Sequence, residues 1–209
     1  MTTDRTAPPD RYAAVVLAGG AARRMGGADK PGVRVGGRSM RDRVLDAVAD
    51  AEPRVLVGPE PVEAFPVKVQ TTREDPPGAG PVAAVAAGLV LIDPEVPVVA
   101  LLAADLPLLT GEAVSSLRRE FTGGTADGVC FVDDDGRRQP LCGVWRVSAL
   151  RTALTSVADG RADGLVGASM RTLLAGLNVT ELPWSGAGPP PWFDCDTDDD
   201  VRRAEEWVR

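Results

Sequence analysis

The chain has 209 residues, of which 30 are acidic and 23 basic, so its formal net charge is −7. This length suffices for one domain with a full hydrophobic core, and the acidic balance argues against a nucleic-acid-binding surface. The sequence contains no histidine, which excludes histidine acid–base catalysis, Ser-His and Cys-His nucleophile pairs, and histidine-ligated metals.

Neither the cysteines nor the N-terminal residues indicate a secreted or membrane protein. Cys130, Cys142 and Cys195 have no zinc or redox spacing, so we expect reduced thiols buried by packing. Residues 1–10 are polar and lack the apolar core of a signal peptide, and no apolar run is long enough to span a membrane. We therefore expect a flexible tail at 1–10, a single domain over 11–209, a cytoplasmic location and no membrane contact.

In chain order, short apolar runs alternate with segments of helical periodicity. The apolar runs predict strands at 13–17, 54–57, 67–69, 98–103, 128–132, 141–146 and 178–182. Helices are predicted from Met40 onward, with Ser39 as N-cap, and over 81–92, 111–121, 148–158, 168–175 and 199–208. This alternation predicts an α/β fold: a single doubly wound (Rossmann-like) sheet, mixed but mostly parallel, with helices on both faces. The turn sequence Asp-Asp-Asp-Gly at 133–136 predicts a hairpin, and hence one antiparallel strand in the sheet.

A glycine-rich segment follows the first predicted strand. Residues 17–30 read Leu-Ala-Gly-Gly-Ala-Ala-Arg-Arg-Met-Gly-Gly-Ala-Asp-Lys. Glycines let the backbone approach a ligand closely, arginine offers a bidentate fork to phosphate oxygens, and lysine adds a movable charge. The segment is neither a P-loop, because Pro31 follows Lys30, nor a dinucleotide fingerprint, because its glycine spacing is wrong. It predicts a site for a nucleoside triphosphate.

Asp105 follows the continuous apolar run 98–103, at the predicted carboxyl end of a buried strand. Open α/β sheets bind ligands at such ends, and Mg²⁺ prefers one or two carboxylates together with phosphate oxygens and water. Asp105 is therefore a candidate magnesium ligand, and the alternative is a turn or capping aspartate before the next helix.

Residues 17–30 resemble L-A-G-G-x-[SA]-x-R-M-G-x(1–2)-D-K, the signature of nucleotidyltransferases with a nucleotide-diphospho-sugar-transferase-like fold, and among these the molybdenum cofactor guanylyltransferases. The resemblance continues in order along nearly the whole chain. Residues 80–85 resemble G-P-L-A-G-[IM], with Ala84 in place of the second glycine, and 105–107 resemble the metal-binding D-x-P segment. Residues 169–174 resemble S-[ML]-R-x-L-L, and 194–197 resemble N-[IV]-[ND]-T. The asparagine that family members often carry near the nucleotide is missing at Gly58-Pro59.

The resemblance implies a role for individual residues. Arg24, Lys30 and Asp105 are expected to be catalytic, with Asp105 as the Mg²⁺ ligand. The expected nucleotide-binding residues are Leu17, Ala18, Gly19, Gly20, Arg24, Met25, Gly26, Lys30, Asp75, Gly80, Pro81 and Asp105. The expected acceptor-binding residues are Arg138, Gln139, Arg171, Asp194 and Asp196. The alternative for Asp75 is that it is a solvated acidic residue of a loop. The alternative for Arg138 is that it lies on a solvated face of the hairpin. Asp194 and Asp196 are expected either to cap the last helix or to make a second metal contact.

The reaction implied by the resemblance is transfer of GMP from GTP to the phosphate of molybdopterin, with release of pyrophosphate and Mg²⁺ as cofactor. The implied partners are these small molecules, with transient contact to molybdoenzymes or to proteins of cofactor biosynthesis. Three alternatives stay open: cytidylyl transfer to the same pterin, synthesis of a sugar or isoprenoid-precursor nucleotide, and a non-catalytic nucleotide-binding module. Guanine is favoured because cytidylyl-transferring relatives more often show L-A-A-G where this chain has L-A-G-G.

Overall fold

The computed structural model describes residues 11–19, 30–59 and 68–208, which form a seven-stranded sheet and a small separate hairpin. The strands of the sheet lie in the order β5-β4-β1-β6-β8-β7-β9. Their bounds are β1 Ala13–Leu17, β4 Arg54–Val57, β5 Gln70–Thr72, β6 Val98–Ala103, β7 Gly128–Val132, β8 Arg138–Arg146 and β9 Val179–Pro183. β8 is antiparallel to both β6 and β7, and the other neighbouring strands are parallel. The predicted mixed, mostly parallel sheet is confirmed.

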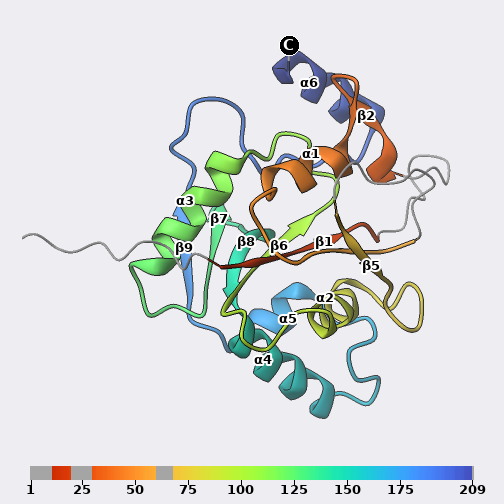
Figure 1. The fold of residues 1–209 in the computed structure, drawn as a ribbon, viewed down its shortest axis with the longest axis vertical. Coiled ribbons are helices and arrows are strands. Elements are labelled where there is room, and N and C mark those ends of the chain that lie inside the picture. Colours follow the sequence, from red (N-terminus) through yellow and green to blue (C-terminus); the bar gives the residue numbers. More distant parts are fainter. Residues whose placement is uncertain (1–10, 20–29, 60–67, 209) are drawn as a thin grey trace, which may run out of the picture.

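Helices cover both faces of the sheet (Figure 1). Their bounds are α1 Met40–Ala47, α2 Pro81–Val90, α3 Gly111–Thr122, α4 Val147–Asp159, α5 Met170–Leu174 and α6 Asp198–Val208. α1 and α3 pack on one face, and α2, α4 and α5 on the other (Figure 1). Ser39 caps α1 as predicted, because its Oγ accepts from the Asp42 N–H at 3.1 Å. Among the helices of the described residues, none combines the length and apolar character needed to cross a membrane.

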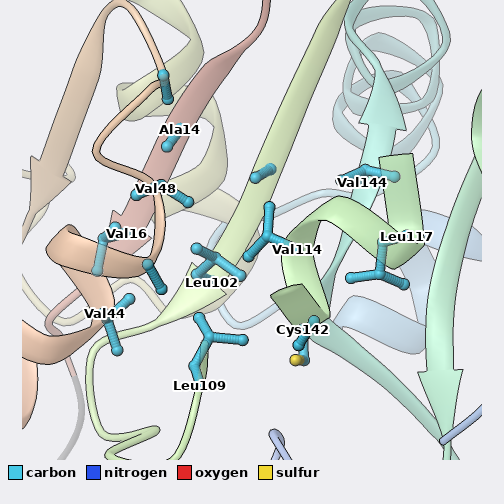
Figure 2. Close-up of a cluster of buried hydrophobic side chains, with 14 of the residues drawn as sticks. Ala14, Val16, Val44, Val48, Leu102, Leu109, Val114, Leu117, Cys142 and Val144 are labelled. Carbon is cyan, nitrogen blue, oxygen red and sulfur yellow. The ribbon is translucent and has the colours of Figure 1, made fainter. Parts of the chain in front are cut away.

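The central strands are buried on both sides, which explains why they read as unbroken apolar runs. On β1, Ala14 and Val16 belong to the core beneath α1 and α3, whereas Val15 belongs to the core on the opposite face. Figure 2 shows the first of these cores, where Val114 of α3 lies among side chains from the neighbouring strands. Leu102 of β6 joins the same core. Burial on both faces fixes the register in which β1 and β6 end.

Several element boundaries differ from the sequence prediction. β5 lies at Gln70–Thr72 and not at 67–69, of which residue 67 is outside the described part of the chain. β5 is an edge strand with exposed Gln70 and Thr71, so apolar character does not mark it. β8 begins at Arg138, before the predicted start, because its polar first residues pair with the end of β7. α2 and α5 are shorter than predicted, since α2 ends at Val90 and α5 spans only Met170–Leu174.

A third small core forms between α6 and a hairpin that the sequence analysis missed. The hairpin joins β2 (Arg34–Val35) to β3 (Arg38–Ser39) after a short 3₁₀ helix, η2 (Lys30–Gly32). Its Gly-Gly turn at 36–37 was an available signal. The buried members of this core are Val35, Met40, Leu108, Cys195 and Ala204. Cys195, like Cys130 and Cys142, is a buried free thiol, as the cysteine spacing predicted.

Candidate active site

The predicted functional segments meet at one edge of the sheet. Leu17, at the end of β1, pairs with Val57 of β4 and Ala103 of β6, so these parallel strands end together. The antiparallel β8 begins at the same edge, where Arg138 pairs with Val132 at the end of β7. The beginning of the glycine-rich segment, the Asp105 segment and the predicted acceptor segment therefore emerge at the carboxyl edge. Ligands of open α/β sheets bind at this edge.

Three carboxylates from distant parts of the sequence cluster at this edge. Asp105, Asp194 and Asp196 each offer one oxygen, and these oxygens lie within 4.8 Å of one another. Asp105 comes from the loop after β6, whereas the other two come from the segment before α6. Like charges at such distances repel, and a divalent cation offsets that repulsion. The cluster is a candidate Mg²⁺ site. It contains Asp105, the predicted metal ligand, together with Asp194 and Asp196, for which a second metal contact was one of the two interpretations.

Backbone and core contacts hold the cluster together. Cys195 lies between Asp194 and Asp196 in the sequence, and its N–H donates to the Asp105 carbonyl oxygen at 3.3 Å. The Cys195 side chain is fully buried in the small core beneath α6. Because Cys195 is fixed inside, its sequence neighbours Asp194 and Asp196 are held next to the end of β6.

The N-terminus of α6 is capped by Thr197 and Asp200. The Asp200 Oδ2 accepts from the Thr197 N–H at 2.9 Å, and the Asp200 N–H donates to the Thr197 Oγ1 at 3.2 Å, a reciprocal capping arrangement. The backbone N–H of Asp196 also donates to the Asp200 carboxylate, at 3.2 Å. The capping carboxylate is thus Asp200, while the side chains of Asp194 and Asp196 belong to the cluster with Asp105.

Aromatic contacts anchor the segment that leads from β9 to the cluster. Trp184 packs edge-on against Phe131 of β7, with ring centroids 5.5 Å apart, and Trp192 packs against the same ring at 5.4 Å. Phe131 is fully buried. Both ends of the segment between Trp184 and Trp192 are therefore fixed to β7, shortly before the chain reaches Asp194.

Only the start of the glycine-rich segment is described. Leu17 is buried, and the Ala18 N–H donates to the Val57 carbonyl at 2.7 Å, which sets the direction in which Gly19 leaves the sheet. The predicted residues outside the described part are Gly20, Arg24, Met25 and Gly26. The Lys30 side chain is also outside it, although the backbone of this residue begins η2. Their roles in binding the triphosphate stay predictions.

The turn between β5 and α2 lies next to the start of the glycine-rich segment, since a methyl group on Gly19 would be 3.8 Å from the Glu74 Oε1. Asp75 is exposed, whereas its neighbour Glu74 is 8% exposed and its Oε1 accepts from the Gly78 N–H at 2.9 Å. Gly80 precedes α2 with φ of 100°, a conformation that favours glycine, and Pro81 occupies the first turn. The buried carboxylate of Glu74, which the sequence did not single out, thus holds the turn through its hydrogen bond to Gly78.

The predicted acceptor residues on β8 already make contacts within the protein. The Arg138 Nε donates to the Glu181 Oε1 of β9 at 2.7 Å, and both side chains are 45% exposed. The Gln139 Nε2 donates to the Asp133 carboxylate at 3.1 Å. Exposed ion pairs of this kind contribute about 0–1 kcal/mol to stability, so a phosphate can compete for Arg138. Arg171 is an exposed residue of α5.

Residues 14–176 match the MobA-like NTP transferase domain family. Asp194 and Asp196 lie beyond the matched range. The chain is 31% identical over 200 residues to a molybdenum cofactor guanylyltransferase of Bradyrhizobium sp. (strain ORS 278), covering 91% of this chain and 90% of that protein. It is 32% identical over 213 residues to a molybdenum cofactor guanylyltransferase of Rhizobium meliloti (strain 1021), covering 97% and 93% of the two chains.

Solved structures share the fold at lower identity. Molybdopterin-guanine dinucleotide biosynthesis protein A from Archaeoglobus fulgidus superposes with a TM-score of 0.68 at 22% identity, over 92% of this chain and 96% of that one. The 2-C-methyl-D-erythritol 4-phosphate cytidylyltransferase from Thermus thermophilus also gives 0.68, at 17% identity, over 94% and 98%. The fold is therefore common to enzymes whose names specify guanine and cytosine, so base preference must be argued from individual residues.

Proposed function

Because this chain belongs to the MobA-like NTP transferase family, we propose that it transfers GMP from GTP to the phosphate of molybdopterin. The product is the guanine dinucleotide form of the cofactor, and pyrophosphate is released. The observation that carries the proposal is the cluster of Asp105, Asp194 and Asp196, which lies at the same sheet edge as the beginning of the glycine-rich segment. Two relatives at 31% and 32% identity that carry the guanylyltransferase name support it.

The residues of the cluster fit a hard divalent cation. Carboxylate oxygens are the protein ligands that Mg²⁺ prefers, and the three oxygens lie within 4.8 Å of one another. Bound there, Mg²⁺ would neutralise negative charge on the phosphates and so lower the repulsion that opposes the reaction. We infer that Asp105, Asp194 and Asp196 hold the ion, with Asp105 as the principal ligand.

The reaction needs no nucleophile from the protein, in agreement with a chain that lacks histidine. The acceptor phosphate is an anion at neutral pH, since the second pKa of a phosphate monoester is about 6. Its oxygen attacks the α-phosphorus of GTP, a new P–O bond forms, and the bond to the departing pyrophosphate breaks. The protein contributes by positioning the two phosphates and by stabilising charge. Arg24 and Lys30 are proposed to bind the triphosphate, and Arg138 to meet the anionic acceptor.

The proposal also includes the cellular setting inferred from the sequence. We expect the protein to act in the cytoplasm on small-molecule substrates, with transient contact to molybdoenzymes or to other proteins of cofactor biosynthesis. Cytidylyl transfer to the same acceptor is the alternative, since the fold itself does not select the base: a cytidylyltransferase with a different acceptor shares it.

The deciding experiment measures pyrophosphate release from each of the four nucleoside triphosphates, with Mg²⁺ and molybdopterin carrying molybdate. We expect release with GTP, formation of the guanine dinucleotide by mass spectrometry, and no release after chelation of the metal. Preferential turnover of CTP would replace the guanylyl proposal with the cytidylyl alternative. Tight GTP binding without any pyrophosphate release would favour a non-catalytic nucleotide-binding module.

A further inference from the structure

The loop over residues 161–168 connects α4 to α5 and is folded around one side chain. The Arg161 Nε donates to the Gly164 carbonyl oxygen and its Nη2 donates to the Val166 carbonyl oxygen, each at 3.0 Å. Gly164 and Gly167 have φ of 55° and 66°, the left-handed conformation that glycine adopts without strain. Because arginine presents its donors in a rigid fork, one guanidinium group fixes both carbonyl groups relative to each other.

This loop is joined to the turn that precedes α2, and Figure 1 shows it passing beside that helix. The Gly167 N–H donates to the carbonyl oxygen of buried Ala79 at 2.7 Å. The two segments lie close together, since a methyl group on Gly80 would be 3.9 Å from the Gly167 Cα. Gly80 is the N-cap of α2 and has no side chain with which to cap it. The backbone contact from Gly167 therefore supports the start of this helix.

The turn that receives this hydrogen bond belongs to the proposed nucleotide site. It contains Asp75 and Gly80, which together with Pro81 were expected to bind the nucleotide. It also lies beside Gly19, at the start of the glycine-rich segment. Misplacing a binding group by about 1 Å can cost roughly 10²-fold in rate. A contact that holds the turn from outside the site can therefore matter for function.

We propose that Arg161 is a positioning residue of the nucleotide site. It fixes the loop between α4 and α5, and the loop holds the turn before α2 through the hydrogen bond from Gly167 to Ala79. This inference rests on the proposed nucleotidyl transfer, but it does not depend on which base is bound. Loss of Arg161 should weaken nucleotide binding and leave acceptor binding unchanged, because Arg138 is held by Glu181 on other elements.

Arg151 offers a matched control at the opposite end of α2. Its Nη2 donates to the carbonyl oxygens of Leu89, at 3.2 Å, and Ile92, at 2.8 Å. Both arginines thus bind two backbone carbonyl groups, and truncation of either removes one positive charge. Since Arg151 contacts the C-terminal end of α2, its loss should lower stability without moving the turn that precedes the helix.

The experiment measures the dissociation constant of GTP with Mg²⁺ by calorimetry, and the unfolding temperature, for the wild type, Arg161→Ala and Arg151→Ala. We expect GTP binding to weaken about 3- to 30-fold in Arg161→Ala and by less than about twofold in Arg151→Ala. The unfolding temperature should fall at least as much in Arg151→Ala, whose side chain is the more buried of the two. KM for molybdopterin should stay unchanged in both variants.

A small-molecule replacement for the lost side chain separates positioning from general stability. The Arg161 side chain lines an open groove between α4 and α5, so a small cation can reach the position that Arg161→Ala vacates. Millimolar methylguanidinium should restore GTP binding in this variant, because it offers the same fork of donors to the two carbonyl groups. Methylammonium, which has the charge without the fork, should not restore it.

Each other outcome rejects a defined statement. If Arg161→Ala and Arg151→Ala weaken GTP binding by the same factor, the site responds to overall stability and the positioning role is wrong. The role is also wrong if Arg161→Ala binds GTP as the wild type does, or if methylammonium restores binding as well as methylguanidinium does. If the wild type prefers CTP, the guanylyl function is rejected, and the same comparison made with CTP decides the role of Arg161. If the wild type binds no nucleoside triphosphate, both proposals are rejected.

Discussion

The backbone N–H of Cys195 donates to the backbone carbonyl oxygen of Asp105 at 3.3 Å, and this contact joins the end of β6 to the segment before α6. Cys195 is fully buried, while the carboxylates of Asp194 and Asp196 join that of Asp105. Folding of the small core beneath α6 therefore assembles the candidate metal site. The stability of this core and the affinity for the metal should be linked.

Replacing the clustered aspartates should separate metal binding from stability. Asp105→Asn should reduce turnover by roughly 10²-fold or more, because it removes the principal charged ligand at the phosphates. Asp194→Asn and Asp196→Asn should mainly raise the Mg²⁺ concentration that gives half-maximal activity. Unfolding temperatures should change little, since these aspartates lie in loops at the edge of the sheet and not within a packed strand or helix. Asp199→Asn, on the exposed surface of α6, is the matched control. A large fall in unfolding temperature with full activity would make Asp105 a structural residue.

Lys30→Ala tests the assignment of the glycine-rich segment to the triphosphate. A charge-assisted hydrogen bond contributes about 1.5–3 kcal/mol, so kcat/KM for GTP should fall roughly 10- to 100-fold. Lys68→Ala, an exposed lysine just before β5, serves as a control for loss of one positive charge. Wild-type kcat/KM in Lys30→Ala would reject the assignment.

The sequence predicted most of the fold because the central strands are buried on both faces. β1, β4, β6 and β7 have their predicted bounds, since each consists mainly of buried apolar residues. β5 was misplaced because an edge strand needs no apolar residues, and the β2–β3 hairpin was missed because each strand has only two residues. Local pattern carries little information for such elements.

The site was predictable only in part, for a related reason. Asp105 could be found from its place after a buried strand. Its proximity to Asp194 and Asp196 depends on a contact between residues 105 and 195, which no local pattern encodes. The burial of Glu74, which holds the turn before α2, likewise follows from packing and not from a local pattern.

The ion pair between Arg138 and Glu181 offers a test of acceptor binding. Arg138→Gln should raise KM for molybdopterin and leave binding of GTP unchanged, because the substitution removes a charge at the acceptor end of the site only. Glu181→Gln should lower KM for molybdopterin, since Arg138 then no longer pairs with a carboxylate. Both variants should change the free energy of unfolding by less than about 1 kcal/mol, as expected for an exposed pair. Unchanged KM values in both variants would remove Arg138 from the acceptor site.

The buried thiols predict a defined pH dependence. Burial raises the pKa of Cys130 to about 11 from an ordinary value of 9.0, and burial also raises the pKa of Cys142. Between pH 9 and 11 the unfolded chain loses thiol protons that the folded chain retains, so the free energy of unfolding should fall as pH rises through this window. Urea titrations at several pH values measure the free energy of unfolding of the wild type and of Cys130→Ala. The free energy of the variant should decrease less as the pH rises. Native protein at about pH 8, below this window, should react slowly with a thiol reagent, and rapid labelling of Cys130 would contradict the prediction.

Trp192 tests whether the aromatic anchor on β7 positions the metal ligands. Trp192 packs on Phe131 close in sequence to Asp194, whereas Trp184 packs on the same ring but lies at the end of β9. Trp192→Ala and Trp184→Ala should each lower the free energy of unfolding by about 1–3 kcal/mol, because both remove a partly buried indole from the same cluster. Only Trp192→Ala should also raise the Mg²⁺ concentration needed for half-maximal activity, since it loosens the segment that carries Asp194 and Asp196. The measurement is therefore a pair of Mg²⁺ titrations made well below both unfolding temperatures. Equal shifts in the two variants would mean that the site responds to overall stability, and that the anchor at Trp192 has no specific part in holding the carboxylates.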